Sequence, residues 1–240
     1  MRAIGVIPAR FSSTRFIGKV LADLGGKPVV QHVWENAKKS KTLDDLIIAA
    51  DDERIIKTAE GFGAKAVYTS PDQPSGTDRV IEVVNPIDVD VIINIQGDEP
   101  MVRPEMIDEL ARAILDSKDV YMATLARKIE NKNEIKDPNI VKVVKDKNGF
   151  ALYFSRSVIP YPRYETIPLY YKHIGLYAYT KDFLFEFANL PKSHLEMSEG
   201  LEQLRVLENG YRIKVVETKF DTIGIDTLED LKRAKQIMGL

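Results

Sequence analysis

The sequence of 240 residues contains no cysteine, only three histidines and no long hydrophobic run. The absence of cysteine excludes a disulfide framework, a thiolate nucleophile and any cysteine-ligated zinc or iron–sulfur centre. No apolar stretch approaches the roughly 18 residues of a membrane-spanning helix, and Pro8 and Arg10 interrupt the apolar segment near the start. We therefore expect a cytoplasmic protein with no signal peptide and no membrane insertion.

Charge of one sign is not in excess either. The chain has 34 basic and 36 acidic residues, a formal net charge of -2. Such a balance gives no overall attraction to nucleic acid or to an anionic membrane, so we expect neither as a partner. Hydrophobic residues make up 44% of the chain, which is enough to bury the core of one large α/β domain. Any anion must be bound by a local group of cations.

Apolar runs and helical patterns alternate through the first half of the chain. The runs predict buried strands at residues 3–7, 46–50, 66–68 and 89–96, with helices between them and a further helix from Pro104. This alternation is typical of a parallel sheet with right-handed crossovers. Because ligands bind at the carboxyl ends of parallel strands, the polar loops after these strands are expected to converge on one crevice.

The second half of the chain has a different pattern. Short strands at residues 122–126, 141–144 and 151–154, separated by charged turns, predict an antiparallel insertion. Residues 156–168 are too irregular for a helix or strand, and we interpret them as a flap or a subunit contact.

The remaining segments are predicted as helices at 181–189 and 199–209, a strand at 212–217 and a final helix. A strand at 172–180 is expected to have one buried face and one polar face, the polar face carrying His173, Gly175, Tyr177 and Tyr179. The final helix is expected to bury the stripe Leu228, Leu231, Ala234 and Ile237.

The loop after the first predicted strand carries Arg10, Arg15 and Lys19, spaced five and four residues apart. No helical apolar pattern lies between them, so the spacing suits cations that surround a polyphosphate better than cations on one helix face. The sequence contains neither a GxxxxGK[ST] motif nor a GxGxxG motif after this strand, so any nucleotide must be bound by another architecture. The alternative is a solvated loop after an edge strand.

Two aspartates lie at positions suited to a metal ion. Asp98 follows Gly97 after the most apolar strand, and Asp226 precedes the final helix. One or two carboxylates are the usual protein ligands of Mg²⁺, which completes its shell with phosphate and water oxygens. The structural alternatives are a turn at Asp98 and a helix N-cap at Asp226.

Several further polar residues are candidates only as a group, because each has an ordinary structural role. Hydroxyl groups cap helices, an arginine or glutamate often lies on the exposed side of a helix, and a half-buried histidine in a strand is usually structural. No one of them alone indicates a function. They are Ser75, Gly76, Thr77, Arg79, His173, Glu202 and Gln203.

Six segments occur in a distinctive order: VIPARFSSTRFIGK (6–19), PSGTDR (74–79), NIQGDEP (94–100), HIGLY (173–177), EQLR (202–205) and GIDT (224–227). Their order and spacing resemble those of the 3-deoxy-manno-octulosonate cytidylyltransferases, also called CMP-Kdo synthetases, from end to end. The combination of PSGTDR with NIQGDEP is highly specific. The chain departs from the family pattern at Phe16-Ile17, Val20 and Gln73, where the family usually has Leu-Pro, Pro and His.

The resemblance implies a nucleotide-diphospho-sugar transferase fold: a glycosyltransferase-A-like, three-layer α/β architecture with a mixed, mainly parallel sheet and an antiparallel dimerisation insertion. It also implies a homodimer and the reaction CTP + 3-deoxy-D-manno-octulosonate (Kdo) → CMP-Kdo + diphosphate, for lipopolysaccharide biosynthesis. One catalytic domain is expected over residues 1–240. Within it, 1–120 would bind the nucleotide, about 121–220 the sugar and the second subunit, and 221–240 would close the metal site.

The resemblance further implies roles for single residues. Catalysis is expected from Arg10, Lys19, Asp98 and Asp226, with Mg²⁺ held by the two aspartates. The nucleotide is expected to contact Ala9, Arg10, Ser12, Arg15, Lys19, Pro74, Ser75, Gly76 and Gln96. Kdo is expected to contact Arg79, Gln96, Arg156, His173, Tyr177, Glu202 and Gln203.

Two other functions stay open at this point. One is a cytidylyltransferase for another 2-keto sugar acid, such as N-acetylneuraminate, which would differ in the sugar pocket. The other is a catalytically silent nucleotide-binding module of the same fold, against which the presence of both Asp98 and Asp226 argues. Diphosphate release with a panel of sugar acids would separate the three.

Overall fold

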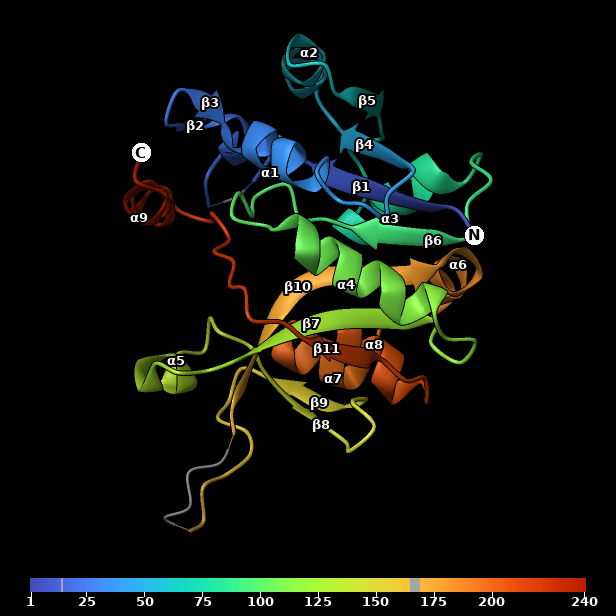
Figure 1. Ribbon diagram of the computed structural model, residues 1–240, viewed down its shortest axis with the longest axis vertical. Helices are drawn as coiled ribbons and strands as arrows, with labels where there is room; N and C mark the ends of the chain where they lie inside the picture. The colour runs from blue at the N-terminus through green and yellow to red at the C-terminus, as the bar shows by residue number, and fades with distance from the viewer. Residues whose placement is uncertain (14, 165–168) are drawn as a thin grey trace.

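The computed structural model describes residues 1–13, 15–164 and 169–240 (Figure 1). Thr14 of the predicted phosphate loop and residues 165–168 of the predicted flap lie outside the described residues. In the described part, one sheet contains the strands β1 (Ala3–Ala9), β4 (Asp45–Ala50), β5 (Lys65–Tyr68), β6 (Val91–Asn94), β7 (Met122–Lys128), β8 (Lys142–Lys145), β9 (Ala151–Ser155), β10 (Tyr171–Thr180) and β11 (Lys214–Glu217). Their order is β11-β7-β10-β6-β1-β4-β5, and β8 pairs with both β10 and β9.

Helices cover both faces of this sheet. The helices of the described part are α1 (Val29–Ala37), α2 (Glu53–Gly61), α3 (Gly76–Val84), α4 (Pro104–Leu115), α5 (Lys132–Lys136), α6 (Lys181–Asn189), α7 (His194–Glu199), α8 (Gln203–Glu208) and α9 (Leu228–Met238). The first core contains buried residues of α1, α2 and α4, and the second contains those of α3, α6 and α8. A short 3-10 helix, η1 (Lys19–Leu21), and the two-stranded pair β2 (Asp23–Leu24) and β3 (Lys27–Pro28) precede α1. No helix in the described ranges is both long enough and apolar enough to cross a membrane.

The central strand β1 shows why the fold has three layers. Ile7 and Ala9 lie in the first core, whereas Ile4 and Val6 lie in the second. Successive side chains of a strand point to opposite faces, so an almost continuous apolar run is buried on both sides. The predicted three-layer α/β fold with a mixed sheet is confirmed.

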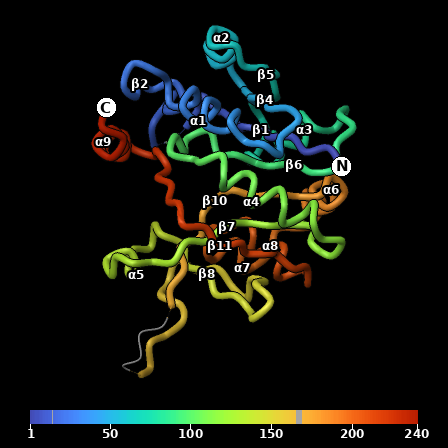
Figure 2. The backbone as a smooth tube through the Cα atoms, viewed as in Figure 1, coloured from blue at the N-terminus to red at the C-terminus, as the bar shows by residue number. Residues whose placement is uncertain are grey.

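Strand direction brings the polar loops together. β1 runs parallel to β4 and to β6, and β4 runs parallel to β5. The carboxyl ends of these four strands therefore lie along one edge of the sheet, as expected from the sequence. β10 is antiparallel to β6 and β7. After β11 the chain passes along this region and reaches α9 beside β2 (Figure 2).

Two expectations about the second half need correction. β7 does not belong to a separate antiparallel insertion, because it lies inside the main sheet, antiparallel to β10 and parallel to β11. Its first five residues are buried, and β11, which returns late in the chain, covers its free edge. The face of β10 that carries Tyr179 is not a polar surface, since Tyr179 is 1% exposed and stacks on Phe187 in the second core.

The helices near the C-terminus also differ from the prediction. The helix expected at 199–209 is the shorter α8. A helix that was not predicted, α7, precedes it and ends at Gly200, which has a left-handed conformation. In α9, Leu228 and Ile237 are 56% and 50% exposed, because this helix packs mainly on the narrow surface near β2. The stripe that it does bury consists of Leu231, Ala234 and Met238.

Candidate active site

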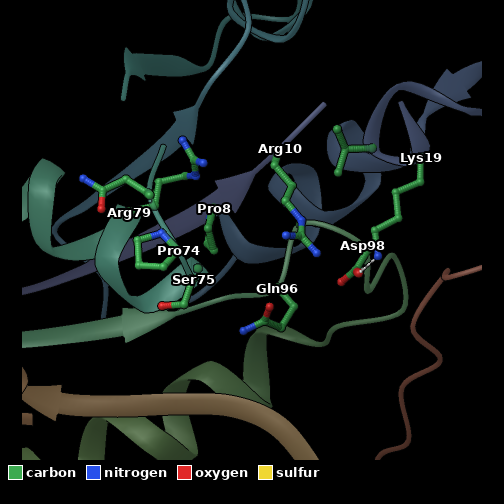
Figure 3. A pocket seen from close by; sticks show the side chains of 12 residues that line it. Pro8, Arg10, Lys19, Pro74, Ser75, Arg79, Gln96 and Asp98 are labelled. Atoms are coloured by element: carbon green, nitrogen blue, oxygen red, sulfur yellow. Dashed lines mark hydrogen bonds and ion pairs between the residues drawn. The ribbon is translucent and has the colours of Figure 1, made fainter. Parts of the chain in front are cut away.

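A cavity of about 330 Å³ lies where β1 and β6 end (Figure 3). Its walls come from the loop after β1, the loop leading into α3 and the loop after β6. The lining residues are Pro8, Arg10, Lys19, Val20, Gln73, Pro74, Ser75, Gly76, Arg79, Gln96, Gly97 and Asp98. Three segments that are far apart in the sequence thus meet at the carboxyl edge of the sheet.

The loop after β1 contributes unequally to this cavity. Arg10 is exposed and its guanidinium points towards Gln96 across the cavity (Figure 3). Ala9 is fully buried in the first core, so only its backbone can meet a ligand, and Ser12 is exposed outside the lining. The backbone N–H of Phe11 donates to Asp51 Oδ1 at 2.8 Å, which ties this loop to the end of β4.

Gly97 allows the loops after β1 and β6 to touch. A Cβ atom at this position would lie 2.7 Å from the carbonyl oxygen of Pro8, closer than real Cβ contacts. Glycine is therefore required for the close backbone approach that brings Arg10 and Asp98 to one cavity.

Asp226 reaches the same place by a backbone contact. The N–H of Ile225 donates to the carbonyl oxygen of Asp98 at 2.9 Å, which holds the segment before α9 against the loop after β6. Asp226 is not the N-cap of α9, because Thr227 caps this helix in a capping box with Asp230. The carboxylate of Asp226 is therefore available for another role.

Lys19 lies between the two aspartates. Its ammonium donates to Asp98 Oδ2 and to Asp226 Oδ1, the latter at 2.8 Å, while Arg15 Nη2 lies 3.0 Å from Asp226 Oδ2. Lys19 is only 6% exposed. Burial by itself lowers the pKa of Lys19, but Asp98 and Asp226 outweigh it and hold that pKa above its ordinary value. The ammonium is thus firmly protonated and shared by both carboxylates.

This arrangement fits a magnesium site. Two carboxylates that accept from one nitrogen atom are close enough to bind one cation together, and Lys19 stands in for that cation here. Mg²⁺ typically takes one or two carboxylates and fills its other positions with phosphate and water oxygens. No group of three or more histidine, aspartate or glutamate side chains that could hold a metal ion occurs in the described residues.

The loop before α3 forms the wall opposite Lys19. Ser75 is the N-cap of α3: its Oγ accepts from Asp78 N at 3.1 Å and donates to Asp78 Oδ2 at 2.7 Å. Both hydrogen bonds of this hydroxyl are therefore made within the protein. Pro74, Ser75 and Gly76 present mainly backbone and apolar atoms to the cavity. Gln96 points into the space between this wall and Arg10 (Figure 3).

A second group of predicted residues lies next to this wall. Thr77 follows Gly76 in α3, and its hydroxyl donates to Glu202 Oε2 at 2.8 Å. Burial, together with the charges of Glu202 and Glu99, raises the pKa of Tyr177. Gln203 is buried, and its Nε2 has no hydrogen-bond partner within the described ranges. Tyr177, Glu202 and Gln203 thus form a partly buried polar group in which Gln203 Nε2 is an available donor.

Two arginines expected at the sugar are used elsewhere. Arg79 is 3% exposed, and its guanidinium bonds to Thr69 Oγ1, to Ser70 O at 3.1 Å and to Asp51 Oδ2 at 3.3 Å. The charge of Arg79 is thus already paired within the protein, its side chain also lines the cavity, and the contact with a sugar acid stays a prediction. Arg156 donates to the carbonyl oxygens of Glu199 and Pro138 at 2.7 and 3.1 Å and lines neither this cavity nor the one described next.

A second cavity, of about 450 Å³, borders Asp226. Its lining includes Arg15, Asp226, His173, Gly175 and Lys172. It also includes Glu99, which sequence reasoning did not select although it lies inside the NIQGDEP motif. Burial and the neighbouring Asp98 raise the pKa of Glu99 to about 7, and its Oε2 is buried with no partner in the described part of the chain. No sequence signal separates this carboxyl group from an ordinary turn residue.

His173 is held as a neutral ring. Its Nε2 lies 2.9 Å from Thr124 Oγ1, whose own hydrogen is directed at the carbonyl oxygen of Leu176, also at 2.9 Å. The ring therefore donates from Nε2. Phe154 packs edge-on against it with ring centroids 4.9 Å apart. Burial lowers the pKa of His173 to about 3.

We expect His173 to make the free energy of unfolding depend on pH. Its folded pKa lies below that of the unfolded chain, so the unfolded chain binds the proton first as the pH falls. The stabilisation is complete above about pH 6.5 and is lost progressively towards about pH 3. Between about pH 7.5 and about pH 5 the loss should reach about 2 kcal/mol.

Urea unfolding at these two pH values measures the effect. In His173→Gln the loss of stability on acidification should be smaller by that amount. His194→Gln, which alters an exposed histidine at the start of α7, serves as the matched control and should follow the wild type. The same pH dependence in His173→Gln and the wild type would show that the ring is not kept neutral by folding.

Comparison with known proteins places the chain among nucleotidyltransferases. The family model described as cytidylyltransferase matches residues 4–215. A 3-deoxy-manno-octulosonate cytidylyltransferase from Solibacter usitatus is 51% identical over 98% of this chain and 94% of its own length. One from Thermodesulfovibrio yellowstonii is 50% identical over 100% and 99%.

Solved structures agree with the sequence relatives. A structure of CMP:2-keto-3-deoxy-manno-octonic acid synthetase complexed with CTP has a TM-score of 0.95 and 42% identity, and covers 100% of this chain and 99% of that chain. The 4-diphosphocytidyl-2C-methyl-D-erythritol synthase from Anaerococcus prevotii has a TM-score of 0.67 at 18% identity, covering 100% and 99%. The latter likeness shows the fold alone.

Proposed function

The chain belongs to the 3-deoxy-manno-octulosonate cytidylyltransferase family, and from this premise we propose that it transfers the cytidylyl group of CTP to Kdo. The reaction is CTP + Kdo → CMP-Kdo + diphosphate. The observation that carries this proposal is the set of Lys19, Asp98 and Asp226, joined at the mouth of a cavity that also contains Arg10. The product activates Kdo for lipopolysaccharide biosynthesis, a step that we place in the cytoplasm.

The chemistry is an in-line attack by the anomeric hydroxyl of Kdo on the α-phosphorus of CTP. The bond from oxygen to phosphorus forms, the phosphoanhydride breaks, and diphosphate leaves with the electron pair. Such transfers need mainly alignment and neutralisation of charge. Arg10 and Lys19 line the cavity and Arg15 lies beside Asp226, so the three cations surround the place where the leaving group gains charge.

Asp98 and Asp226 are the residues that would hold Mg²⁺. The bound ion would polarise phosphate oxygens and lower the pKa of a nearby hydroxyl group. The chain's own contribution is to hold both carboxylates at one point through the Ile225 to Asp98 backbone bond. Pro74, Ser75, Gly76 and Gln96 would enclose the cytidine, with Gln96 at the boundary to the sugar.

Kdo is a carboxylate with several hydroxyl groups, and the polar group beside the first cavity suits it. Tyr177 and Gln203 can donate hydrogen bonds, and Glu202 can accept them. Because His173 is neutral, it would meet the sugar as a hydrogen-bonding ring and not as a cation. Arg156 stays a predicted contact of the sugar carboxylate, which would have to draw it away from its present carbonyl partners.

We further propose that two chains form a homodimer. Residues 156–164, which follow β9, extend away from the rest of the molecule (Figure 1). Tyr161 and Tyr164 on this segment are 83% and 73% exposed. Exposed aromatic side chains of this kind are enriched in protein interfaces.

A diphosphate-release assay with CTP, Mg²⁺ and a panel of sugar acids tests the proposed function. Kdo should be used at least about 100-fold more efficiently than N-acetylneuraminate, because a pocket of paired polar groups discriminates strongly against a ligand that leaves them unpaired. Preference for N-acetylneuraminate would assign the chain to the other sugar acid. Release of no diphosphate with any sugar acid would leave a nucleotide-binding protein without this activity.

A further inference from the structure

We propose that Lys19 is an internal counter-ion that holds Asp98 and Asp226 together before substrates arrive, and that a divalent cation displaces it onto the phosphates of the nucleotide. Metal and nucleotide would then bind cooperatively. The inference rests on the proposed function only in placing a divalent cation and a triphosphate in this cavity.

The geometry makes the ammonium and a metal ion mutually exclusive. Lys19 Nζ donates one hydrogen bond to each carboxylate, to Asp98 Oδ2 and to Asp226 Oδ1. A cation bound by both carboxylates would occupy the same point. Two positive charges cannot share it, because their repulsion would act at contact distance. One of them must leave when the other enters.

The side chain, and not the backbone, is the part able to move. Lys19 begins η1, and the turn before it is held by the N–H of Gly18, which donates to Phe11 O at 2.8 Å. The aliphatic chain of Lys19 reaches down to Asp98 along the cavity that Arg10 also lines (Figure 3). Rotation about its own bonds would turn the ammonium from the carboxylates into that cavity.

Neither ligand alone makes the exchange favourable. A metal ion without nucleotide would leave the ammonium buried and unpaired, since Lys19 is 6% exposed. A nucleotide without metal would draw Lys19 and Arg15 to its phosphates and leave the two aspartates facing each other. When both ligands bind, every charge stays paired. The metal ion replaces Lys19 and Arg15 at the carboxylates, and these two cations pair with the phosphates. Binding of either ligand therefore raises the affinity for the other by the same factor.

The exchange also keeps the site assembled. In the present state Lys19 links the loop after β1 to the loop after β6 and to the segment before α9. A divalent cation would maintain the link between the last two segments. A variant without the ammonium and without metal would have two uncompensated carboxylates at this junction and should be less stable.

The test measures binding of Mn²⁺ alone, by electron paramagnetic resonance, to the full chain with no nucleotide and no sugar acid. Lys19→Met should bind Mn²⁺ at least about tenfold more tightly than the wild type, because the competing ammonium is gone. Mn²⁺ should also raise the melting temperature of Lys19→Met much more than that of the wild type. Lys57→Met, which removes an exposed lysine of α2, is the matched control and should equal the wild type in both measurements.

Each outcome decides the matter. Equal or weaker binding of Mn²⁺ by Lys19→Met would overturn the proposal. If Lys19→Met folds only when Mn²⁺ is added, the metal has replaced the ammonium and the proposal stands. If it fails to fold at any concentration of Mn²⁺, the ammonium has a role that the ion cannot take over, and the proposal fails. Because no sugar acid is present, a failed transferase assay leaves this result unaffected.

Discussion

Asp98→Asn should lower kcat for diphosphate release by about 10³-fold or more, with the fold intact. Asparagine has the same size and can still accept a hydrogen bond from Lys19, so the Ile225 to Asp98 backbone contact should persist. What is lost is the negative charge that, with Asp226, would hold the divalent cation at the reacting phosphate. Because this charge acts on the transition state, its removal lowers kcat and not only the affinity for the substrates.

Steady-state kinetics with CTP, Kdo and Mg²⁺, beside thermal unfolding, measure this effect. Asp119→Asn is a suitable control, because Asp119 is exposed after α4 and its carboxylate has no hydrogen bond or ion pair in the described residues. It should retain wild-type rates. Near-normal turnover of Asp98→Asn at ordinary Mg²⁺ concentrations would refute the role of this carboxylate as a metal ligand.

Arg79→Ala should cost about 3 to 5 kcal/mol of stability, because it removes one partner of a buried ion pair. Asp51 would remain, with a side chain only 7% exposed and a single backbone donor, the N–H of Phe11. Thr69 and Ser70 would lose the same guanidinium. The loss should appear in chemical denaturation, since the arginine supports the wall of the cavity from behind.

A double-mutant cycle separates this structural role from contact with the sugar. The loss of stability in the double variant Arg79→Met/Asp51→Asn should be clearly smaller than the sum of the losses in the two single variants, because no unpaired charge is then buried. Arg54→Ala, at an exposed arginine that also pairs with an aspartate, should change stability far less than Arg79→Ala does, because water screens the exposed pair. Normal stability of Arg79→Ala together with a selective rise in KM for Kdo would return Arg79 to the sugar pocket.

The positions of the loops around the site were predictable from local pattern. Apolar runs of the right length identify β1, β4 and β6, and polar loops after parallel strands meet at one edge. Asp98 could be chosen because it follows Gly97 at such a point. The choice of Asp226 over an N-cap role could not be made locally, because the next residue, Thr227, is an equally good cap.

Errors arose where a residue's surroundings come from distant parts of the chain. The structural alternative for Arg79, a cation on the exposed side of a helix, does not hold, because Asp51 and Thr69 enclose its guanidinium. The second face of β10 looks polar in an alternating strand, but α6 covers Tyr179. Leu228 fits a helical stripe, but its side chain is more than half exposed. Burial depends on what packs against an element, and periodicity describes only the element itself.

By itself, the amino-acid sequence determined the alternating strands and helices, the edge at which the loops gather, and the charged groups present there. Those follow from local backbone geometry and from the period of the apolar residues. Only the tertiary structure decided that Lys19 pairs with Asp98 and Asp226 while Arg79 pairs with Asp51. Ion pairs form over a few ångströms, and such distances are set by the packing of segments up to 207 residues apart.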